Sequence, residues 1–260
     1  MPRTDVDALI VGAGFSGIYM LKRCRELGLR ALVIEAAADV GGTWYWNRYP
    51  GARCDVESMT YSYSFSDDLQ REWTWTERYG KQPEILRYIA HVVERFDLRR
   101  DMQFETRVTA AAFDDTSNRW AIETDRGETI SAKYCIMATG CLSTPAQPDF
   151  KGLDSFEGDT YHTGRWPHEK IDFTGKRVGI VGTGSSAVQS IPVIAAEAAH
   201  LTVFQRTPNF SVPAFHGPLD ADVVHMWQTR HQELRERARA SRIGDIFEFS
   251  ETSALDLTPE

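Results

Sequence analysis

The sequence predicts an α/β fold that contains two dinucleotide-binding, Rossmann-like units. Two glycine-rich turns, at residues 12–17 and 182–187, each follow a short apolar run and precede a helical pattern. Between them, three strand-like runs separated by polar turns predict an antiparallel β-meander that extends the first unit. After the second unit, a polar helical pattern at residues 222–242 predicts the start of a helical insertion.

The first unit runs from a predicted strand at residues 6–11, through a helix, to an apolar run that ends at Glu35. In the turn between strand and helix, Gly12 permits a tight turn, Gly14 lets the backbone approach a pyrophosphate, and Gly17 lets helix and strand pack closely. The N–H groups at the start of the helix attract phosphates. Glu35 lies 23 residues after Gly12 and can accept hydrogen bonds from a ribose diol. This unit is therefore expected to bind FAD or NAD.

The second unit has a predicted strand at residues 176–182, a helix at 185–199 and a strand at 201–204. Where the first unit has Glu35, 23 residues after its first turn glycine, this unit has Gln205, followed directly by Arg206 and Thr207. A carboxylate there would repel a 2′-phosphate, whereas a guanidinium can bind it through two hydrogen bonds, so NADP(H) is expected rather than NAD(H). The alternative is that Arg206 is a solvated charge at the end of a strand. The other expected cofactor contacts are Gly182, Thr183, Gly184, Ser185, Ser186, Gln189 and Thr207.

Residues 41–55 combine glycines with aromatic side chains, and this composition predicts a long loop over a ligand rather than a helix. The alternative is that Trp44, Trp46 and Tyr49 form a small hydrophobic cluster under that loop. Helical periodicity returns at residues 83–96, where a proline occupies the first turn and costs no hydrogen bond.

Composition excludes several classes of protein. With 42% hydrophobic and 25% charged residues, the 260-residue chain is typical of a globular protein of one or two domains. A net charge of −8 argues against nucleic acid or an anionic membrane surface as the main partner. The four cysteines have neither zinc-site nor disulfide-framework spacing, so no metal is expected. No signal peptide and no apolar run of about 18 residues is present, so a cytoplasmic protein is expected.

The most specific motif lies between the two units, where the sequence fits the pattern Phe-x-Gly-x-x-x-His-x-x-x-Trp-Pro. Its specified positions are Phe156, Gly158, His162, Trp166 and Pro167. By itself this stretch could be a solvent-exposed connector with a buried tryptophan. Together with the two glycine turns, it resembles the fingerprint of the Baeyer–Villiger flavin monooxygenases, in particular the members that oxidise phenylacetone, steroids and cyclohexanone. The resemblance runs to the end of the chain, but those enzymes are much longer, so the chain corresponds to their N-terminal half only.

The resemblance implies a division of the chain into four parts. Residues 1–142 would form the N-terminal part of an FAD-binding domain, 143–175 a linker with the fingerprint, 176–213 the N-terminal part of an NADP-binding domain, and 214–260 the start of a helical insertion. In these enzymes the chain later returns to complete both nucleotide-binding domains. We therefore expect the 260-residue chain alone to be poorly soluble or to bind FAD weakly, with little ketone oxidation.

The resemblance also implies roles for individual residues of the first unit. The loop at residues 41–55 would wrap the isoalloxazine ring, and the backbone of Val108 would lie against the adenine. Arg53, which is close in sequence to Asp55, is expected to meet the nicotinamide cofactor. The implied flavin contacts are Thr43, Trp44, Tyr45, Trp46, Asp55 and Tyr61. Residues 138–140, Ala-Thr-Gly, match a motif of flavoproteins with two dinucleotide-binding folds.

The implied reaction begins with hydride transfer from NADPH to FAD. The reduced flavin captures O2 as a C4a-peroxide, which attacks a ketone, and rearrangement gives an ester or lactone. The protein must orient the reactants, exclude water and stabilise negative charge. In the family an arginine provides this charge stabilisation, partnered by an aspartate that corresponds to Asp55, and that arginine lies beyond residue 260. Asp55 is thus the catalytic candidate, with a loop-capping carboxylate as the alternative.

The fingerprint residues His162 and Trp166 would couple movements of the two domains rather than transfer protons. The alternative for His162 is a linker histidine that is hydrogen-bonded to the backbone. Two other functions stay open for the chain. One is a flavin monooxygenase that oxidises nitrogen or sulfur, since it shares both glycine turns. The other is an inactive nucleotide-binding fragment, or a subunit that needs a partner chain. The identity of the ketone is not encoded in any motif found.

Overall fold

The computed structural model describes residues 4–142, 144–246, 252–253 and 256. The chain forms two compact units. The larger unit comprises Met1–Arg53 and Lys81–Val212, and the smaller unit comprises Cys54–Gly80 and Pro213–Glu260. The domain boundaries inferred above stay predictions. The helix predicted at residues 222–242 is confirmed as α6 (Ala221–Ala240), and residues 247–251, 254–255 and 257–260 of the predicted helical insertion lie outside the described residues.

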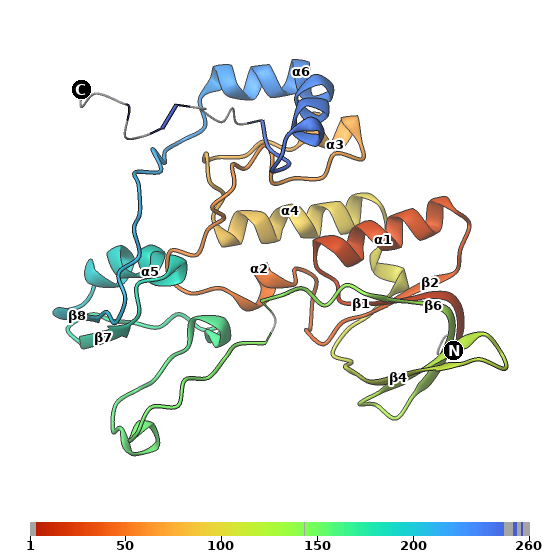
Figure 1. The fold of residues 1–260 in the computed structure, drawn as a ribbon, viewed down its shortest axis with the longest axis horizontal. Helices are drawn as coiled ribbons and strands as arrows, with labels where there is room; N and C mark the ends of the chain where they lie inside the picture. Colours follow the sequence, from red (N-terminus) through yellow and green to blue (C-terminus); the bar gives the residue numbers. More distant parts are fainter. Residues whose placement is uncertain (1–3, 143, 247–251, 254–255, 257–260) are drawn as a thin grey trace. The chain divides into compact units, whose positions relative to one another are not determined.

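The larger unit contains a six-stranded sheet with the strand order β3-β2-β1-β6-β5-β4 (Figure 1). The strands are β1 (Asp5–Val11), β2 (Ala31–Ile34), β3 (Met102–Gln103), β4 (Val108–Asp114), β5 (Arg119–Thr124) and β6 (Thr129–Met137). β1 pairs in parallel with both β2 and β6, and β4, β5 and β6 pair antiparallel. The predicted α/β fold with a meander attached to the first unit is confirmed.

Two helices pack beside each other along this sheet, α1 (Phe15–Glu26) and α4 (Gln82–Arg95), as Figure 1 shows. Each is amphipathic, because its apolar residues recur every three or four positions and therefore face one side. The buried apolar side chains are Ile18, Leu21 and Cys24 of α1 and Ile85, Tyr88, Ile89, Val92 and Val93 of α4. A second apolar cluster, which includes Val6, Leu9 and Ile122, joins β1, β2, β5 and β6.

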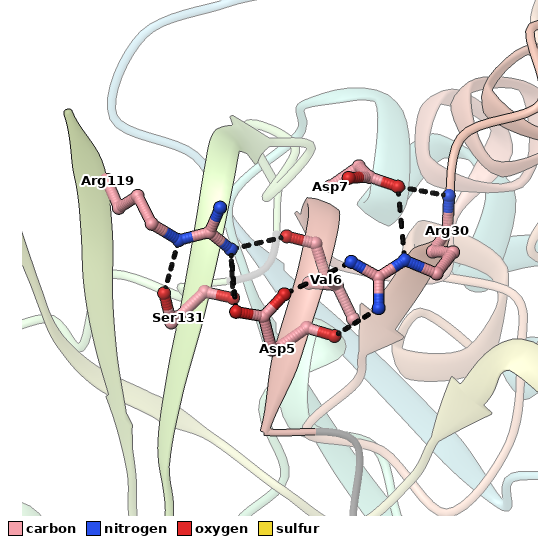
Figure 2. A network of polar contacts seen from close by, with 6 residues as sticks. All are labelled: Asp5, Val6, Asp7, Arg30, Arg119 and Ser131. Carbon is pink, nitrogen blue, oxygen red and sulfur yellow. Dashed lines mark hydrogen bonds and ion pairs between the residues drawn. The ribbon is translucent and has the colours of Figure 1, made fainter. Parts of the chain in front are cut away.

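A charged network holds the start of β1 (Figure 2). Arg119 of β5 donates from Nη2 to the carbonyl oxygen of Val6 at 3.0 Å and pairs with Asp5 at 3.2 Å. Arg30, which precedes β2, pairs with Asp5 at 3.1 Å, and its backbone N–H donates to the Asp7 carboxylate at 2.8 Å. Because these groups are exposed or only partly buried, solvent screens the ion pairs and each contributes little to stability. The network therefore aligns three neighbouring segments more than it stabilises them.

The second βαβ unit is confirmed, with β7 (Arg177–Val181), α5 (Ser185–Ala195) and β8 (His200–Phe204). β7 and β8 form a two-stranded parallel sheet. Parallel strands are normally covered on both faces, yet Val181 and Phe204 are 64% and 57% exposed. α5 ends four residues before the predicted position and contains Pro192, which lacks the N–H that would continue the hydrogen-bond ladder.

The prediction that residues 41–55 contain no helix is wrong for α2 (Thr43–Trp46), a single turn. Gly41 and Gly42 have φ of +137° and +54°, so the chain turns sharply just before the helix. The backbone N–H of Trp46 then bonds to the carbonyl of Gly42 at 3.2 Å. Glycine supplies these φ values at little cost, and the composition that indicated a loop is what makes this turn of helix possible.

The linker predicted at 143–175 contains two short 3₁₀ turns among its described residues, at Leu153–Ser155 and Thr163–Arg165. In the smaller unit, α3 (Asp67–Glu72) and α6 (Ala221–Ala240) pack together. The buried Arg235 of α6 donates to the carbonyl oxygens of Met59 and Thr60 at 2.9 and 2.8 Å. None of the helices in the described residues combines the length and apolarity needed to cross a bilayer.

Candidate cofactor-binding sites

The first glycine turn joins β1 to α1 in a crowded environment. Gly12 has φ +106°, and a Cβ there would lie 2.6 Å from the carbonyl oxygen of Ala138. A Cβ on Gly17 would lie 1.8 Å from the carbonyl oxygen of Gly12. Gly14 faces Gly42, whose own Cβ would lie 2.8 Å from the Gly14 Cα. Side chains are therefore excluded at Gly12, Gly17 and Gly42, and the backbone around Gly14 stays accessible to a ligand.

The N-termini of α1 and α5, like those of α2 and α4, have no side-chain cap within the described chain, unlike those of α3 and α6. Each of α1 and α5 begins after a glycine, Gly14 or Gly184. By contrast, Ser66 caps α3 and Asp220 caps α6 with side-chain oxygens. The first backbone N–H groups of a helix need acceptors, which a phosphate can supply. The chemistry of both glycine turns thus fits a pyrophosphate.

Glu35 lies directly after β2 and is 5% exposed. Its carboxylate accepts hydrogen bonds from the backbone N–H groups of Ala13 and Ala37, at 2.6 and 2.7 Å. These two bonds fix the carboxylate beside the first glycine turn and partly compensate its burial. Each carboxylate oxygen can accept more than one hydrogen bond, so a ribose diol can still be bound. The sequence does not predict the hydrogen bond from the Ala13 N–H to Glu35, because no spacing pattern indicates which backbone group a carboxylate will bind.

The aromatic residues that follow the first turn are held in two different ways. Trp44 is buried, and its carbonyl oxygen accepts a bond of 2.5 Å from Gln82 Nε2, at the start of α4. Tyr45 lies edge-on to Trp46, with ring centroids 4.9 Å apart, and the Arg48 guanidinium lies 5.2 Å from the Tyr45 ring centroid. One helical turn therefore carries Thr43 to Trp46, and these contacts hold its aromatic residues.

The following segment touches α5 through Gln189. The Gln189 Oε1 accepts from the Tyr49 hydroxyl at 3.0 Å and from the Arg53 backbone N–H at 3.1 Å, while its Nε2 donates to the Arg53 carbonyl at 3.1 Å. A Cβ on Gly51 would lie 2.2 Å from the Gln189 carbonyl oxygen. Gln189, expected beside a pyrophosphate, thus binds protein groups with its amide in this structure.

The second glycine turn is open. Gly182 has φ +101°, and a Cβ at Gly182 or Gly184 would meet no described atom within 4 Å. Thr183 is held from the end of β8, because its Oγ1 accepts from Gln205 Nε2 at 2.8 Å and its carbonyl accepts from Asn209 Nδ2 at 2.9 Å. The sequence does not predict these two hydrogen bonds from Gln205 and Asn209 to Thr183.

Arg206 and Thr207 come directly after Gln205, so the contact between Gln205 and Thr183 ties the backbone that carries them to the turn. Both residues are exposed. Ser185 and Ser186 are the first two residues of α5. The residue types expected to contact an anion therefore occur on the strand end and the helix start of one βαβ unit.

Three other predicted residues belong to different parts of the chain. Val108 is the first residue of β4 and is half-buried. Asp55, which is exposed, and Tyr61, which is half-buried, belong to the smaller unit. The Arg235 bonds to the carbonyls of Met59 and Thr60 anchor the backbone immediately before Tyr61.

The fingerprint forms a folded loop. His162 Nδ1 accepts from the Gly164 N–H at 3.0 Å, and its Nε2 lies 3.2 Å from the Ala146 carbonyl oxygen. These are the backbone bonds expected of a linker histidine. Trp166 packs against Tyr161 and Phe173, with ring centroids 5.5 and 6.2 Å away.

A cavity of about 360 Å³ lies beside the fingerprint. Trp166, His168, Arg48 and Ile194 are among the residues that line it. Partial burial and the nearby Arg48 charge lower the pKa of His168, so the neutral imidazole is favoured there. The lining carries charges of both signs and does not define one class of ligand.

Comparison with known proteins gives consistent matches. The model of the pyridine nucleotide-disulphide oxidoreductase family matches residues 9–242. Acetone monooxygenase (methyl acetate-forming) of Gordonia sp. (strain TY-5) is 44% identical over 261 residues, which cover 100% of this chain and 49% of that protein. A Baeyer–Villiger monooxygenase of Pseudooceanicola batsensis is 44% identical over 98% of this chain and 47% of its own. Phenazine N-monooxygenase PhzNO1 of Lysobacter antibioticus is 43% identical over 99% and 48%.

A solved structure, oxidized steroid monooxygenase bound to NADP, superposes with a TM-score of 0.93 at 52% identity. It covers 98% of this chain, which in turn covers 49% of it. The chain therefore spans about half the length of the relatives it matches.

Proposed function

Because the chain belongs to the pyridine nucleotide-disulphide oxidoreductase family and resembles the Baeyer–Villiger monooxygenases within it, we propose that it forms part of an NADPH- and FAD-dependent Baeyer–Villiger monooxygenase. The reaction would insert one oxygen atom from O2 next to a ketone carbonyl and give an ester or lactone. The observation that carries this proposal is the pair of uncapped glycine turns, one followed by the buried carboxylate of Glu35 and the other by the exposed guanidinium of Arg206.

The first βαβ unit would hold FAD. The turn with Gly12, Gly14 and Gly17 would bind the pyrophosphate, and Glu35 would accept hydrogen bonds from the ribose, since its carboxylate is already fixed by two N–H donors. The remaining proposed FAD contacts are Thr43, Trp44, Tyr45, Trp46, Asp55, Tyr61 and the backbone of Val108. Bound FAD would supply the hydride acceptance and O2 activation that no amino-acid side chain provides.

The second βαβ unit would hold NADP(H). The α5 N-terminus, with Gly182, Thr183, Gly184, Ser185 and Ser186, would bind the pyrophosphate, and Arg206 with Thr207 would bind the 2′-phosphate. Arg53 would lie toward the nicotinamide. The anchoring of Thr183 by Gln205 and Asn209 supports this assignment, because it fixes the turn next to Arg206.

Asp55 would act by orienting a guanidinium over the flavin. That arginine is not part of these 260 residues in the family pattern, so the proposal requires a C-terminal half from the same or a second chain. The relatives, of which this chain covers about half, support that requirement. A ketone and O2 would be the small-molecule partners, and a cytoplasmic location stays a prediction.

An N-oxidising monooxygenase is a second candidate, favoured by one observation, the 43% identity to a phenazine N-monooxygenase. The two reactions share both cofactors and differ in the atom that receives oxygen. Product analysis separates them. The purified protein would be incubated with NADPH and O2 in the presence of cyclohexanone or of a tertiary amine.

A lactone formed from cyclohexanone, with no amine oxide, supports the ketone oxidation, and the reverse supports N-oxidation. The same assay with the segment that follows residue 260 in the relatives tests the requirement for a C-terminal half. Failure of the protein to retain flavin, with and without that segment, contradicts the proposed function and favours an inactive fragment.

A further inference from the structure

We propose that Gln189 is a positioning residue that fixes the backbone of Arg53 against helix α5, rather than a ligand of the pyrophosphate. The inference extends the proposed function, which supplies the role of Arg53 toward the nicotinamide. It does not depend on that function for its structural part, which concerns residues 49–53 and α5 alone.

The hydrogen-bonding capacity of the Gln189 amide is largely used within the protein. Its oxygen accepts two bonds, from Tyr49 and from the N–H of Arg53, and its nitrogen donates one to the carbonyl of Arg53. An amide oxygen has two acceptor sites and the NH2 group has two donors. Only one donor therefore remains available for any other ligand.

Both backbone groups of Arg53 are bound by this one side chain, which is the pairing that a neighbouring β-strand would otherwise provide. Glutamate could accept the same two bonds but could not donate to the Arg53 carbonyl. Leucine, with a similar volume, could do neither. The site thus requires an amide.

A second contact supports the same conclusion independently. Gly51 has φ +79°, and its Cα approaches α5 so closely that a Cβ would lie 2.2 Å from the Gln189 carbonyl oxygen and 3.1 Å from Val193 Cγ2. Tyr49, Gly51 and Arg53 all touch the same turn of α5. The segment is therefore packed onto the helix as well as hydrogen-bonded to it.

The position of Gln189 in α5 gives this contact a consequence for the reaction. Gln189 follows Ser185 by four residues, so both lie on one face of the helix, one turn apart. A nicotinamide cofactor bound at the N-terminus of α5 would be placed relative to Arg53 by this helix. Gln189 would thereby set the geometry of hydride transfer without touching the cofactor.

The test compares Gln189→Leu and Gln189→Glu with the unaltered protein. Amide hydrogen exchange of residues 49–53 is measured first, without cofactor. Loss of the bond to the Arg53 N–H predicts exchange that is about two- to tenfold faster in Gln189→Leu, with a smaller increase in Gln189→Glu. Unchanged exchange in both variants overturns the proposal. Gln205→Leu is the control, because it removes the contact to Thr183 and should leave exchange at residues 49–53 unchanged.

The affinity for NADP+ and the rate of flavin reduction by NADPH give the second readout. A positioning residue predicts a Gln189→Leu variant with reduction about tenfold slower and an NADP+ dissociation constant within about twofold of the unaltered protein. A dissociation constant raised tenfold with unchanged exchange would make Gln189 a pyrophosphate ligand and overturn the proposal. Tyr49→Phe, which removes one bond of three, provides a milder variant should Gln189→Leu not fold. If the unaltered protein does not bind NADP+, the proposed function fails while hydrogen exchange still decides the role of Gln189.

Discussion

The two glycine turns have nearly the same backbone but very different surroundings. Gly12 and Gly182 have φ of +106° and +101°, and each precedes a helix with a glycine N-cap. Around the first turn, added Cβ atoms at Gly12 and Gly17 would overlap backbone atoms, whereas at Gly182 and Gly184 they would meet no described atom within 4 Å. The turn conformation is therefore specified locally, and the crowding depends on neighbouring strands.

The strands show the same contrast. Leu9 and Ile10 of β1 are fully buried between β2 and β6, while Val181 of β7 and Phe204 of β8 are more than half exposed. The end of β6 leads into Ala138, whose carbonyl oxygen faces Gly12. In the described residues β7 has β8 as its neighbour and no strand on its other side. In this chain the tightly packed glycine turn is the one that follows a strand with neighbours on both sides.

The largest expected difference between the turns is their tolerance of alanine. Gly17→Ala would force a Cβ to 1.8 Å from the Gly12 carbonyl oxygen, so we expect a loss of about 2–4 kcal/mol in the free energy of unfolding. Gly184→Ala, with space for a Cβ and a negative φ, should cost less than about 1 kcal/mol. Urea unfolding followed by tryptophan fluorescence measures both. Equal losses would show that the two turns are equally crowded in solution.

The next largest expected effect is on nucleotide affinity, and it depends on the side chains that follow β2 and β8. Arg206→Glu places a carboxylate one residue beyond Gln205, the position that corresponds to Glu35 by spacing, and should weaken NADPH binding by about tenfold to a hundredfold while NADH binding changes little. Fluorescence titration with each nucleotide measures the change. Arg177→Glu, an exposed residue at the opposite end of β7, is the matched control and should leave both affinities unchanged. Equal effects of Arg206→Glu and Arg177→Glu on the affinities for NADPH and NADH would show that Arg206 is only a solvated charge at the end of the strand.

The smallest effect is electrostatic and lies at the start of β1. The backbone N–H of Arg30, followed by the charge of its guanidinium, lowers the pKa of the Asp7 carboxyl. Since the folded-state pKa lies below the unfolded value, the carboxylate stabilises the fold above the unfolded pKa of about 3.9, and this contribution is lost as pH falls through the folded pKa. Asp7→Asn should therefore lower the unfolding midpoint slightly at neutral pH and not at low pH.

Urea midpoints from about pH 6 to pH 2 check this expectation. Asp159→Asn is the comparison at the second βαβ unit, because Asp159 lies 3.5 Å from Lys176 with both side chains more than half exposed. Removal of that pair should change the midpoint little at any pH. A constant difference between Asp7→Asn and the unaltered protein across the range would contradict the assignment to titration of Asp7.

Most strands and both turns were predictable because their signals are local. Apolar runs next to glycines determine β1 and β7, and polar turns separate β4, β5 and β6. The short helix α3 was not predicted, since its six residues are mostly polar and offer no periodicity, and its signal is the Ser66 cap with acidic residues after it. The predicted end of α5 lies four residues beyond the observed end at Ala195, because the alanines at 196, 198 and 199 continue the helical pattern of the sequence.

The long-range contacts were not predictable in the same way. The bond from Ala13 to Glu35 spans 22 residues and the bonds between Gln189 and Arg53 span 136. A residue type at one position does not show which backbone group it will bind so far away. The assignments of Asp55, Tyr61 and Val108 came from family resemblance and stay predictions, as do the cofactor roles of the turn residues.

The anchoring of Met59 and Thr60 by Arg235 joins positions up to 176 residues apart in the chain. On the ribosome, the segment that carries Asp55 and Tyr61 is made early, but the helix that holds it emerges only after the larger unit has been synthesised. Non-local contacts of this kind form late in folding. Asp55 and Tyr61, the residues proposed for chemistry, would then become ordered after the glycine turns around Gly12 and Gly182 already exist.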